Sequence, residues 1–212
     1  MEAKLLQTGH DLWYIIGQGG WVMFAIFAAG QMGWFLVVER WWHFRKMRGP
    51  GESFWGKAPQ DRAGMARVLE SRPPRGLLGA VARSIALTRD AGRDAMVART
   101  REVLQQHVPA LSRHLGTIAI IAGAAPLLGL TGTVAGIMQT FKVITLYGAG
   151  NPSMMAGGIA QALMVTEAGL VVAFPLLILH DHLQKRADAI EDEAVAGATR
   201  LIRLFDGKER PA

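Results

Sequence analysis

The chain contains no cysteine, and only 19% of its 212 residues are charged, whereas 50% are hydrophobic. The lack of thiols excludes disulfides, thiol catalysis and thiolate-held metals, and it leaves the redox compartment open. A phosphate-binding loop is also missing, because the glycine-rich stretch from Gly129 to Gly136 is not followed by Lys-Ser/Thr. No nucleophile, base and orienter set can be picked out. We therefore expect no enzyme activity, no cofactor and no metal site; His180, Asp181 and His182 are adjacent on a helix and diverge.

The apolar residues are gathered into three long runs rather than spread with the period of a soluble helix or strand, and the mean hydropathy is +0.21. The runs extend over about residues 13–38, 115–147 and 156–179. Each exceeds the roughly 20 residues that cross a bilayer. The first run is longer than a signal-peptide core and its preceding flank is barely basic, so we expect it to remain as a span. The sequence predicts an all-α, integral membrane protein with three transmembrane helices.

The basic residues, which give a net charge of +6, are unevenly distributed. Between residues 43 and 113 there are 14 Lys/Arg against 6 Asp/Glu, whereas the link at residues 142–153 contains only Lys142. Cytoplasmic loops carry the Lys/Arg excess, which predicts an outer N-terminus and an inner C-terminus. Nucleic acid is disfavoured as a partner because no basic stripe interleaved with aromatics is present.

These observations predict six segments. They are an N-terminal periplasmic tail with the first span (1–42), a cytoplasmic helical loop (43–113), the second span (114–147), a periplasmic turn (148–155), the third span (156–182) and a cytoplasmic C-terminal helix (183–212). Pro109 is an expected bend or break in the loop, and Glu39 with Arg40 is an expected interfacial pair.

Small and hydroxyl residues recur at helical spacing on the second and third runs. The two stripes are Ala122, Pro126, Gly129, Thr133, Gly136 and Thr140, and Ala162, Thr166, Gly169 and Ala173. Small residues let membrane helices approach closely, which makes a packing seam the simpler interpretation. The alternative is a narrow, weakly polar pore wall carrying Thr133, Thr140 and Thr166.

Glu167 lies near the middle of the third run. A carboxylate at that depth costs about 2.5–3.5 kcal/mol on insertion scales, so it should face protein or water. It is either a structural hydrogen-bonding group between helices or a group that handles protons or ions. It is about 100° around the helix from Thr166 and need not share its surroundings. Gln161 is a weaker candidate for a helix-to-helix hydrogen bond.

The two stretches Pro126-Leu-Leu-Gly-Leu-Thr-Gly-Thr-Val-Ala-Gly-Ile-Met-Gln-Thr-Phe141 and Gly157-Gly-Ile-Ala-Gln-Ala-Leu-Met-Val-Thr-Glu-Ala-Gly-Leu-Val-Val-Ala-Phe-Pro175 resemble the paired signature of the MotA/TolQ/ExbB proton-channel family. The similarity is detailed over about residues 115–185 and is closest to the ExbB and TolQ branch. That resemblance implies a homopentamer in the bacterial inner membrane, surrounding two copies of a single-span ExbD- or TolR-like partner that carries the proton-bearing aspartate.

The resemblance also places Thr133 and Thr166 on the family's pore threonines of the second and third spans. One departure is clear, because Gln161 stands where that branch often has glutamate, and Glu167 follows the threonine instead. The function implied is a stator subunit that couples proton flow to a periplasm-spanning TonB- or TolA-like protein. A non-conducting helical scaffold for a partner complex is the alternative, and a solute transporter is disfavoured because three spans show no inverted repeat.

Overall fold

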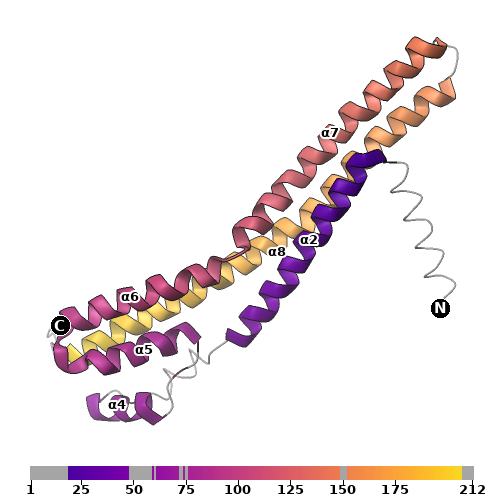
Figure 1. The fold of residues 1–212 in the computed structure, drawn as a ribbon. Coiled ribbons are helices and arrows are strands. Elements are labelled where there is room, and N and C mark those ends of the chain that lie inside the picture. The colour runs from indigo at the N-terminus through magenta and orange to yellow at the C-terminus, as the bar shows by residue number, and fades with distance from the viewer. Residues whose placement is uncertain are drawn as a thin grey trace, which may run out of the picture. The chain divides into compact units, whose positions relative to one another are not determined.

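The computed structural model describes residues 19–47, 59, 61–71, 74, 76–148 and 152–206. Every regular element in these ranges is helical, which confirms the predicted all-α fold (Figure 1). The elements are α2 (Gly20–Met47), α4 (Arg62–Ser71), α5 (Gly76–Thr88), the 3-10 turn η1 (Arg89–Ala91), α6 (Arg93–Ser112), α7 (Leu115–Tyr147) and α8 (Pro152–Asp206). The predicted N-terminal tail, the C-terminal end and the centre of the predicted outer turn lie outside the described residues.

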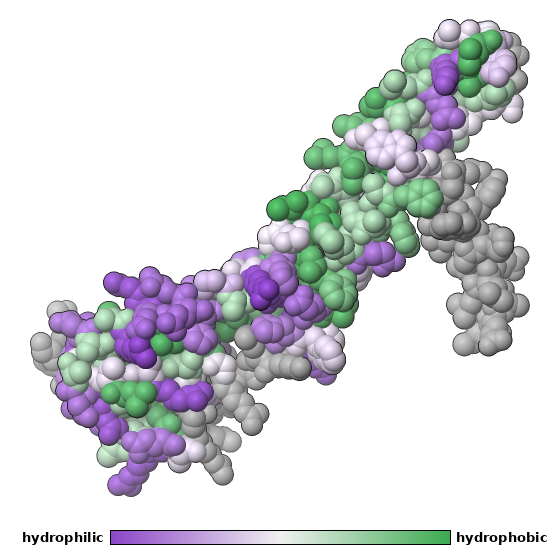
Figure 2. Space-filling model, viewed as in Figure 1, coloured by the Kyte–Doolittle hydropathy of each residue, from purple (hydrophilic) through white to green (hydrophobic). Residues whose placement is uncertain are grey.

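Three helical stretches are long and apolar enough to cross a membrane, and they confirm the predicted number of spans. They run over Gly20–Arg45, Arg93–Tyr147 and Pro152–Asp206, the second including both α6 and α7. The chain forms two compact units, one of residues up to Val38 with His114–Asp181, and one of Glu39–Arg113 with the chain from His182 onward. Figure 2 shows apolar residues covering the α2, α7 and α8 segments of the first unit and polar residues covering much of the second.

In the first unit, α2 packs against α8 through glycines on one of its faces. An ideal Cβ built on Gly30 would lie 3.2 Å from Val172 Cγ1, and one on Gly33 would lie 2.7 Å from Leu176 Cδ1. Near the start of α2, an ideal Cβ on Gly20 would lie 2.9 Å from Gln161 Nε2. Increasing residue numbers on α2 therefore meet increasing numbers on α8, so the two helices run in the same direction. The buried contact between them includes Val22, Met23, Ile26 and Val165.

The second unit is a helical bundle with an apolar interior. Val81 and Ile85 of α5 and Met96 of α6 are almost fully buried. The tail of α8 buries one face at helical spacing, through Leu183, Ala187, Ala194, Ala198 and Leu201. This pattern explains why α8 continues as one helix beyond its apolar run, since an amphipathic helix gains its stability from the face it buries.

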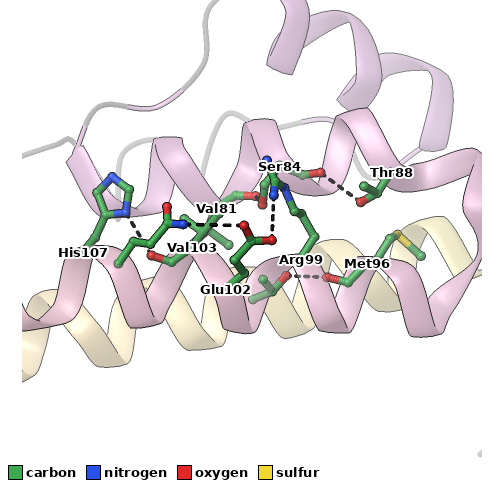
Figure 3. Close-up of polar contacts among 10 residues, drawn as sticks. Val81, Ser84, Thr88, Met96, Arg99, Glu102, Val103 and His107 are labelled. Atoms are coloured by element: carbon green, nitrogen blue, oxygen red, sulfur yellow. Dashed lines mark hydrogen bonds and ion pairs between the residues drawn. The ribbon is translucent and has the colours of Figure 1, made fainter.

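Polar side chains on α5 and α6 mostly bond along their own helix (Figure 3). On α6, Glu102 accepts hydrogen bonds from Arg99 Nη1 at 2.6 Å and from Gln106 Nε2 at 3.5 Å. On α5, the buried hydroxyl of Ser84 donates to Val81 O. On α6, the buried hydroxyl of Thr100 donates to Met96 O. These local bonds satisfy the polar groups without bringing them together into a site.

α6 ends at Ser112 and α7 begins at Leu115. Pro109 lies inside the last turn of α6, and His114 has φ 66°, a left-handed conformation that is unusual for a residue other than glycine. The helical path is thus interrupted a few residues after the proline, at the start of the second predicted span.

Candidate functional site

The stripe of small residues on α7 faces the stripe on α8. Gly129 lies against Thr166, Gly132 against Val165, and Gly136 against Ala162 and Gly158. Rising numbers on α7 meet falling numbers on α8, so these two helices are antiparallel, as Figure 1 also shows. We call this contact the α7–α8 seam. Its residues are Ala125, Gly129, Gly132, Gly136 and Thr140 on α7, and Gly158, Ala162, Val165, Thr166 and Gly169 on α8.

Several positions in the α7–α8 seam have no room for a side chain. An ideal Cβ on Gly136 would lie 2.7 Å from Ala162 Cβ and 2.8 Å from Gly158 O, and one on Gly169 would lie 2.7 Å from Ala125 O. Because backbone atoms form part of each contact, the clash cannot be relieved by turning a side chain. The glycines therefore set the distance between the two helices, the role that small residues have in membrane proteins.

Thr166 links the two helices directly. Its Oγ1 donates to Gly129 O on α7 at 3.1 Å and also lies 3.3 Å from Ala162 O, one turn earlier on α8. The side chain is half-buried, so one side of it stays open at the margin of the seam. A threonine hydroxyl has one hydrogen and two acceptor lone pairs, and the hydrogen here is used inside the protomer.

Thr133 lies one turn along α7 from Gly129 and is also half-buried. Its Oγ1 donates to Leu130 O at 2.7 Å, a bond within its own helix. Thr133 and Thr166 are therefore both half-buried, and each uses its hydroxyl hydrogen within the protomer. Each hydroxyl oxygen keeps lone pairs that can accept a hydrogen bond from outside.

Thr140 lies deeper in the α7–α8 seam. Its side chain is only 8% exposed, and its Oγ1 donates to Gly136 O at 3.1 Å. The same oxygen closes the space over Gly158, where an added Cβ would collide with it. In the protomer, Thr140 is therefore enclosed between α7 and α8.

Glu167 follows Thr166 but lies on the outer side of α8. The exposed apolar residues around it on that helix are Ile159, Leu163, Leu170, Val171 and Phe174. Counting about 100° per residue, Glu167 is about 160° from both Val165 and Gly169 of the seam. The carboxyl group is exposed in the protomer. It thus shares neither the seam nor the surroundings of Thr166.

The seam residues predicted from the sequence are Ala122, Pro126, Gly129, Gly136, Ala162, Gly169 and Ala173. All of these except Pro126 are buried, and Pro126 is partly exposed. Ala125, Gly132 and Gly158 also lie in the seam and were not among the predicted residues. Their signal was present, because Ala125, Gly129, Gly132 and Gly136 have the same spacing of four and three residues as the predicted stripe.

Gln161 is partly exposed, and its side-chain nitrogen lies close to Gly20 at the start of α2. It is therefore on the α2 side of α8, apart from the threonines. Within the described ranges, no three His, Cys, Asp or Glu side chains come close enough together to hold a metal ion.

The apolar surface of α7 that faces away from the seam is large. It includes Leu127, Leu130, Val134, Ile137, Met138 and Phe141, all exposed in the protomer. In a membrane these side chains contact lipid tails or other protein helices. Because three helices in one protomer do not surround a passage, a path along Thr133 and Thr166 requires further protein on this side.

The family profile described as the MotA/TolQ/ExbB proton channel family matches residues 77–195, more than half of the chain. The chain belongs to this family. The match includes the α7–α8 seam, both half-buried threonines and part of the second unit.

Individual relatives agree with the family match. The chain is 40% identical over 89 residues to the biopolymer transport protein ExbB of Aquifex aeolicus, an alignment covering 41% of this chain and 60% of that protein. It is 33% identical over 90 residues to the Tol-Pal system protein TolQ of Haemophilus influenzae, covering 42% of this chain and 40% of the relative. It is 38% identical over 87 residues to ExbB of Salmonella typhimurium, covering 39% and 36%. The chain thus spans at most about 60% of the length of these relatives.

The expected resemblance to the ExbB and TolQ branch is confirmed. Together with the three helices able to span a membrane, it makes the chain a multi-pass protein of the inner (cytoplasmic) membrane. The relatives are named for transport and for the Tol-Pal system.

Proposed function

We propose that this chain is the stator subunit of a proton-driven motor in the inner membrane. Five copies surround a single-span ExbD- or TolR-like protein, and proton flow through the assembly energises a periplasm-spanning TonB- or TolA-like partner. The outer N-terminus and inner C-terminus predicted from the charge distribution belong to this proposal. The chain itself performs no enzymatic step.

The observation that carries the proposal is that Thr133 on α7 and Thr166 on α8 are both half-buried, on two helices that pack closely through the α7–α8 seam. Gly129, Gly132 and Gly136 hold α7 and α8 at a fixed distance, and Thr166 ties the two helices with a hydrogen bond. A wall whose helices do not separate can keep two hydroxyls at fixed positions along a path. Both oxygens retain lone pairs that can accept from water or from a protonated carboxyl group of the partner.

The driving energy is sufficient for such a device. A proton crossing the membrane potential releases about 2.3 kcal/mol per 100 mV. Several protons per cycle can therefore reorient a partner helix inside the ring. In this arrangement the partner supplies the titrating group and the present chain supplies the wall.

Two further residues were predicted to belong to the pathway. Thr140 is enclosed in the α7–α8 seam, so it reaches a shared path only if the helices part near their outer ends. Glu167 is exposed on the side of α8 away from the seam. We therefore place Thr133 and Thr166 first among the pathway residues, and keep Thr140 and Glu167 as secondary members to be tested by substitution.

A non-conducting helical scaffold is the second candidate. The tight α7–α8 seam favours it, because close glycine packing serves a scaffold as well as a channel wall. The two functions differ in whether the hydroxyls of Thr133 and Thr166 matter once the complex has assembled.

The assembly is tested by purifying the chain together with a single-span protein encoded beside it and recording a native mass spectrum in mild detergent and in lipid nanodiscs. We expect five copies of this chain with the partner bound. Only monomers or dimers in both media would overturn the proposed ring.

A further inference from the structure

Glu167 is the only carboxylate on α8 between Pro152 and His180, and it is exposed in the protomer. The neighbouring exposed residues Leu163, Leu170 and Phe174 are all apolar. An ionisable group at this depth is costly against lipid, so it requires a protein or water partner. Within the described part of the protomer no hydrogen bond or ion pair of Glu167 is found, and the partner must come from outside.

The contacts in the seam give the depth of this missing partner. Gly129 contacts both Thr166 and Gly169, which places it level with about residues 167–168 of α8, and Gly132 lies against Val165. Since α7 and α8 are antiparallel, Thr131 on α7 is level with about residues 165–166 of α8, about 1.5–3 Å from the depth of Glu167.

Thr131 is suited to meet the carboxyl group. It is exposed and is turned away from the seam, in contrast to its neighbours Gly129 and Gly132. Its Oγ1 donates to Leu127 O at 3.0 Å and keeps its lone pairs. The group can pair with Glu167 in either form, because a carboxylic acid donates to Oγ1 and a carboxylate accepts the hydroxyl hydrogen after the side chain turns.

Other exposed polar residues of the described spans lie at different depths. Gln31 on α2 follows Gly30, which meets Val172, five residues beyond Glu167 and about 7.5 Å further along α8. Gln139 on α7 is eight residues from Thr131, about 12 Å further along that helix. Thr131 is therefore the best match in depth among them.

We propose that Glu167 of one protomer hydrogen-bonds Thr131 of a second copy of this chain, within the membrane, on each contact around the ring. Rotation about an axis along the membrane normal keeps every residue at its depth, so two residues at the same level on different faces can meet in successive copies. Such a contact joins unlike faces and closes into a ring rather than a two-fold dimer. The inference rests on the proposed homo-oligomer and names the polar contact that sets its register.

The lack of cysteine in the native chain makes a crosslinking test direct. The double variant Thr131→Cys/Glu167→Cys is expressed with the single-span partner and treated in membranes with a short bifunctional methanethiosulfonate reagent. We expect a ladder of crosslinked species in denaturing gels, ending at the closed ring. Either single variant should remain a monomer, and coexpressed single variants carrying different tags should give only mixed dimers.

The matched control is Thr131→Cys/Leu177→Cys. Leu177 is also exposed on α8 but lies ten residues beyond Glu167, about 15 Å further along the helix. No ladder is expected from it. A ladder of equal strength in this control, or no ladder from Thr131→Cys/Glu167→Cys in a complex that assembles, would overturn the Glu167–Thr131 contact.

A swap of the two residues guards against variants that fail to assemble. Thr131→Glu places two carboxyl groups in one contact, and Glu167→Thr leaves two short side chains. Each single variant should therefore show less assembled ring in native gels than the wild type. The double variant Thr131→Glu/Glu167→Thr should recover it, and a double variant no better than the weaker single one refutes the pairing. Proton flux through the reconstituted wild-type complex is measured separately. If the wild-type ring conducts protons but the double cysteine variant gives no ladder, the Glu167–Thr131 contact alone is refuted. If the ladder forms but the wild-type ring does not conduct, the proposed function alone is refuted.

Discussion

Thr166 Oγ1 lies 3.1 Å from Gly129 O, so a hydroxyl of α8 donates to the backbone of α7 within the α7–α8 seam. Both residues belong to the first unit, and their contact fixes the register of the α7–α8 seam. A polar contact between membrane helices contributes about 0.6 kcal/mol on average. Most of the seam's stability therefore comes from the close packing of glycines, and the hydroxyl mainly sets where its own oxygen lies.

Alanine at two seam glycines should weaken the protein. Gly136→Ala and Gly169→Ala each force a Cβ against backbone atoms, and overpacking of this kind costs about 1–3 kcal/mol. We expect a lower apparent melting temperature by fluorescence-detected size exclusion in detergent. The matched controls are Gly123→Ala on α7 and Gly157→Ala on α8, where no atom beyond the local helix backbone lies within 4 Å of the added Cβ.

These controls separate packing from helix propensity, because alanine favours a helix over glycine at every position. The controls should leave stability unchanged or raise it. Equal melting temperatures for Gly136→Ala, Gly169→Ala and the two controls would mean that the seam is looser than described.

Arg40 stabilises the end of α6 in the second unit. Its side chain is only 3% exposed, and its Nη1 donates to Ala110 O at 3.0 Å. Ala110 is among the last four residues of α6, whose carbonyls have no partner further along the helix, and a cation favours that end. Arg40→Met keeps much of the apolar stem but removes the donor and the charge.

We expect Arg40→Met to speed amide hydrogen exchange in the last turn of α6, with a loss of about 1–3 kcal/mol of local stability. Arg101→Met, at an exposed position on α6, serves as the control and should leave exchange in that turn unchanged. Unaltered exchange near Pro109 in Arg40→Met would show that the guanidinium does not stabilise this helix end.

The predicted topology can be measured with single cysteines. Ala98→Cys on α6 should react with an impermeant maleimide only after the membrane is opened, whereas Tyr147→Cys at the end of α7 should react in intact spheroplasts. Both positions are exposed, and the native chain has no cysteine, so the maleimide labels only the introduced thiol. The opposite pattern would reverse the orientation inferred from the Lys/Arg distribution.

The helices and the membrane class followed from the sequence because long apolar runs permit few other structures in a bilayer. The stripe on α7 was predicted one residue away from the observed seam at two positions. The predicted stripe included Pro126 and Thr133, whereas the residues that contact α8 are their neighbours Ala125 and Gly132. All four residues are compatible with the helical spacing of the stripe. Successive residues differ by about 100° around a helix axis, so the spacing of small residues locates the packed face of α7 only to within about one residue. The position of α8 decides which edge of that face is buried.

The sequence also could not show what Arg40 contacts. It was expected to form an interfacial pair with Glu39, and the structure adds a hydrogen bond from its Nη1 to Ala110 O, seventy residues later in the chain. Contacts between distant segments depend on how helices pack, and one chain's residue pattern contains little of that information. The outward position of Glu167 is a similar case, because its neighbours on α8 are evident from spacing and its partner is not.

The proposed role of the two threonines is tested most directly by proton flux. The complex is reconstituted into liposomes containing a pH-sensitive dye, and flux is driven by an imposed potential. Thr133→Val and Thr166→Val keep the side-chain volume and remove the hydroxyl, and Thr145→Val is the control, because Thr145 is exposed and donates to Phe141 O along α7. We predict normal assembly in all three variants and unchanged flux in Thr145→Val. In Thr133→Val and Thr166→Val we predict that flux falls at least about tenfold, which corresponds to about 1.4 kcal/mol in the barrier. Assembled Thr133→Val and Thr166→Val complexes that conduct protons at the wild-type rate would contradict the pathway and leave the α7–α8 seam as packing alone.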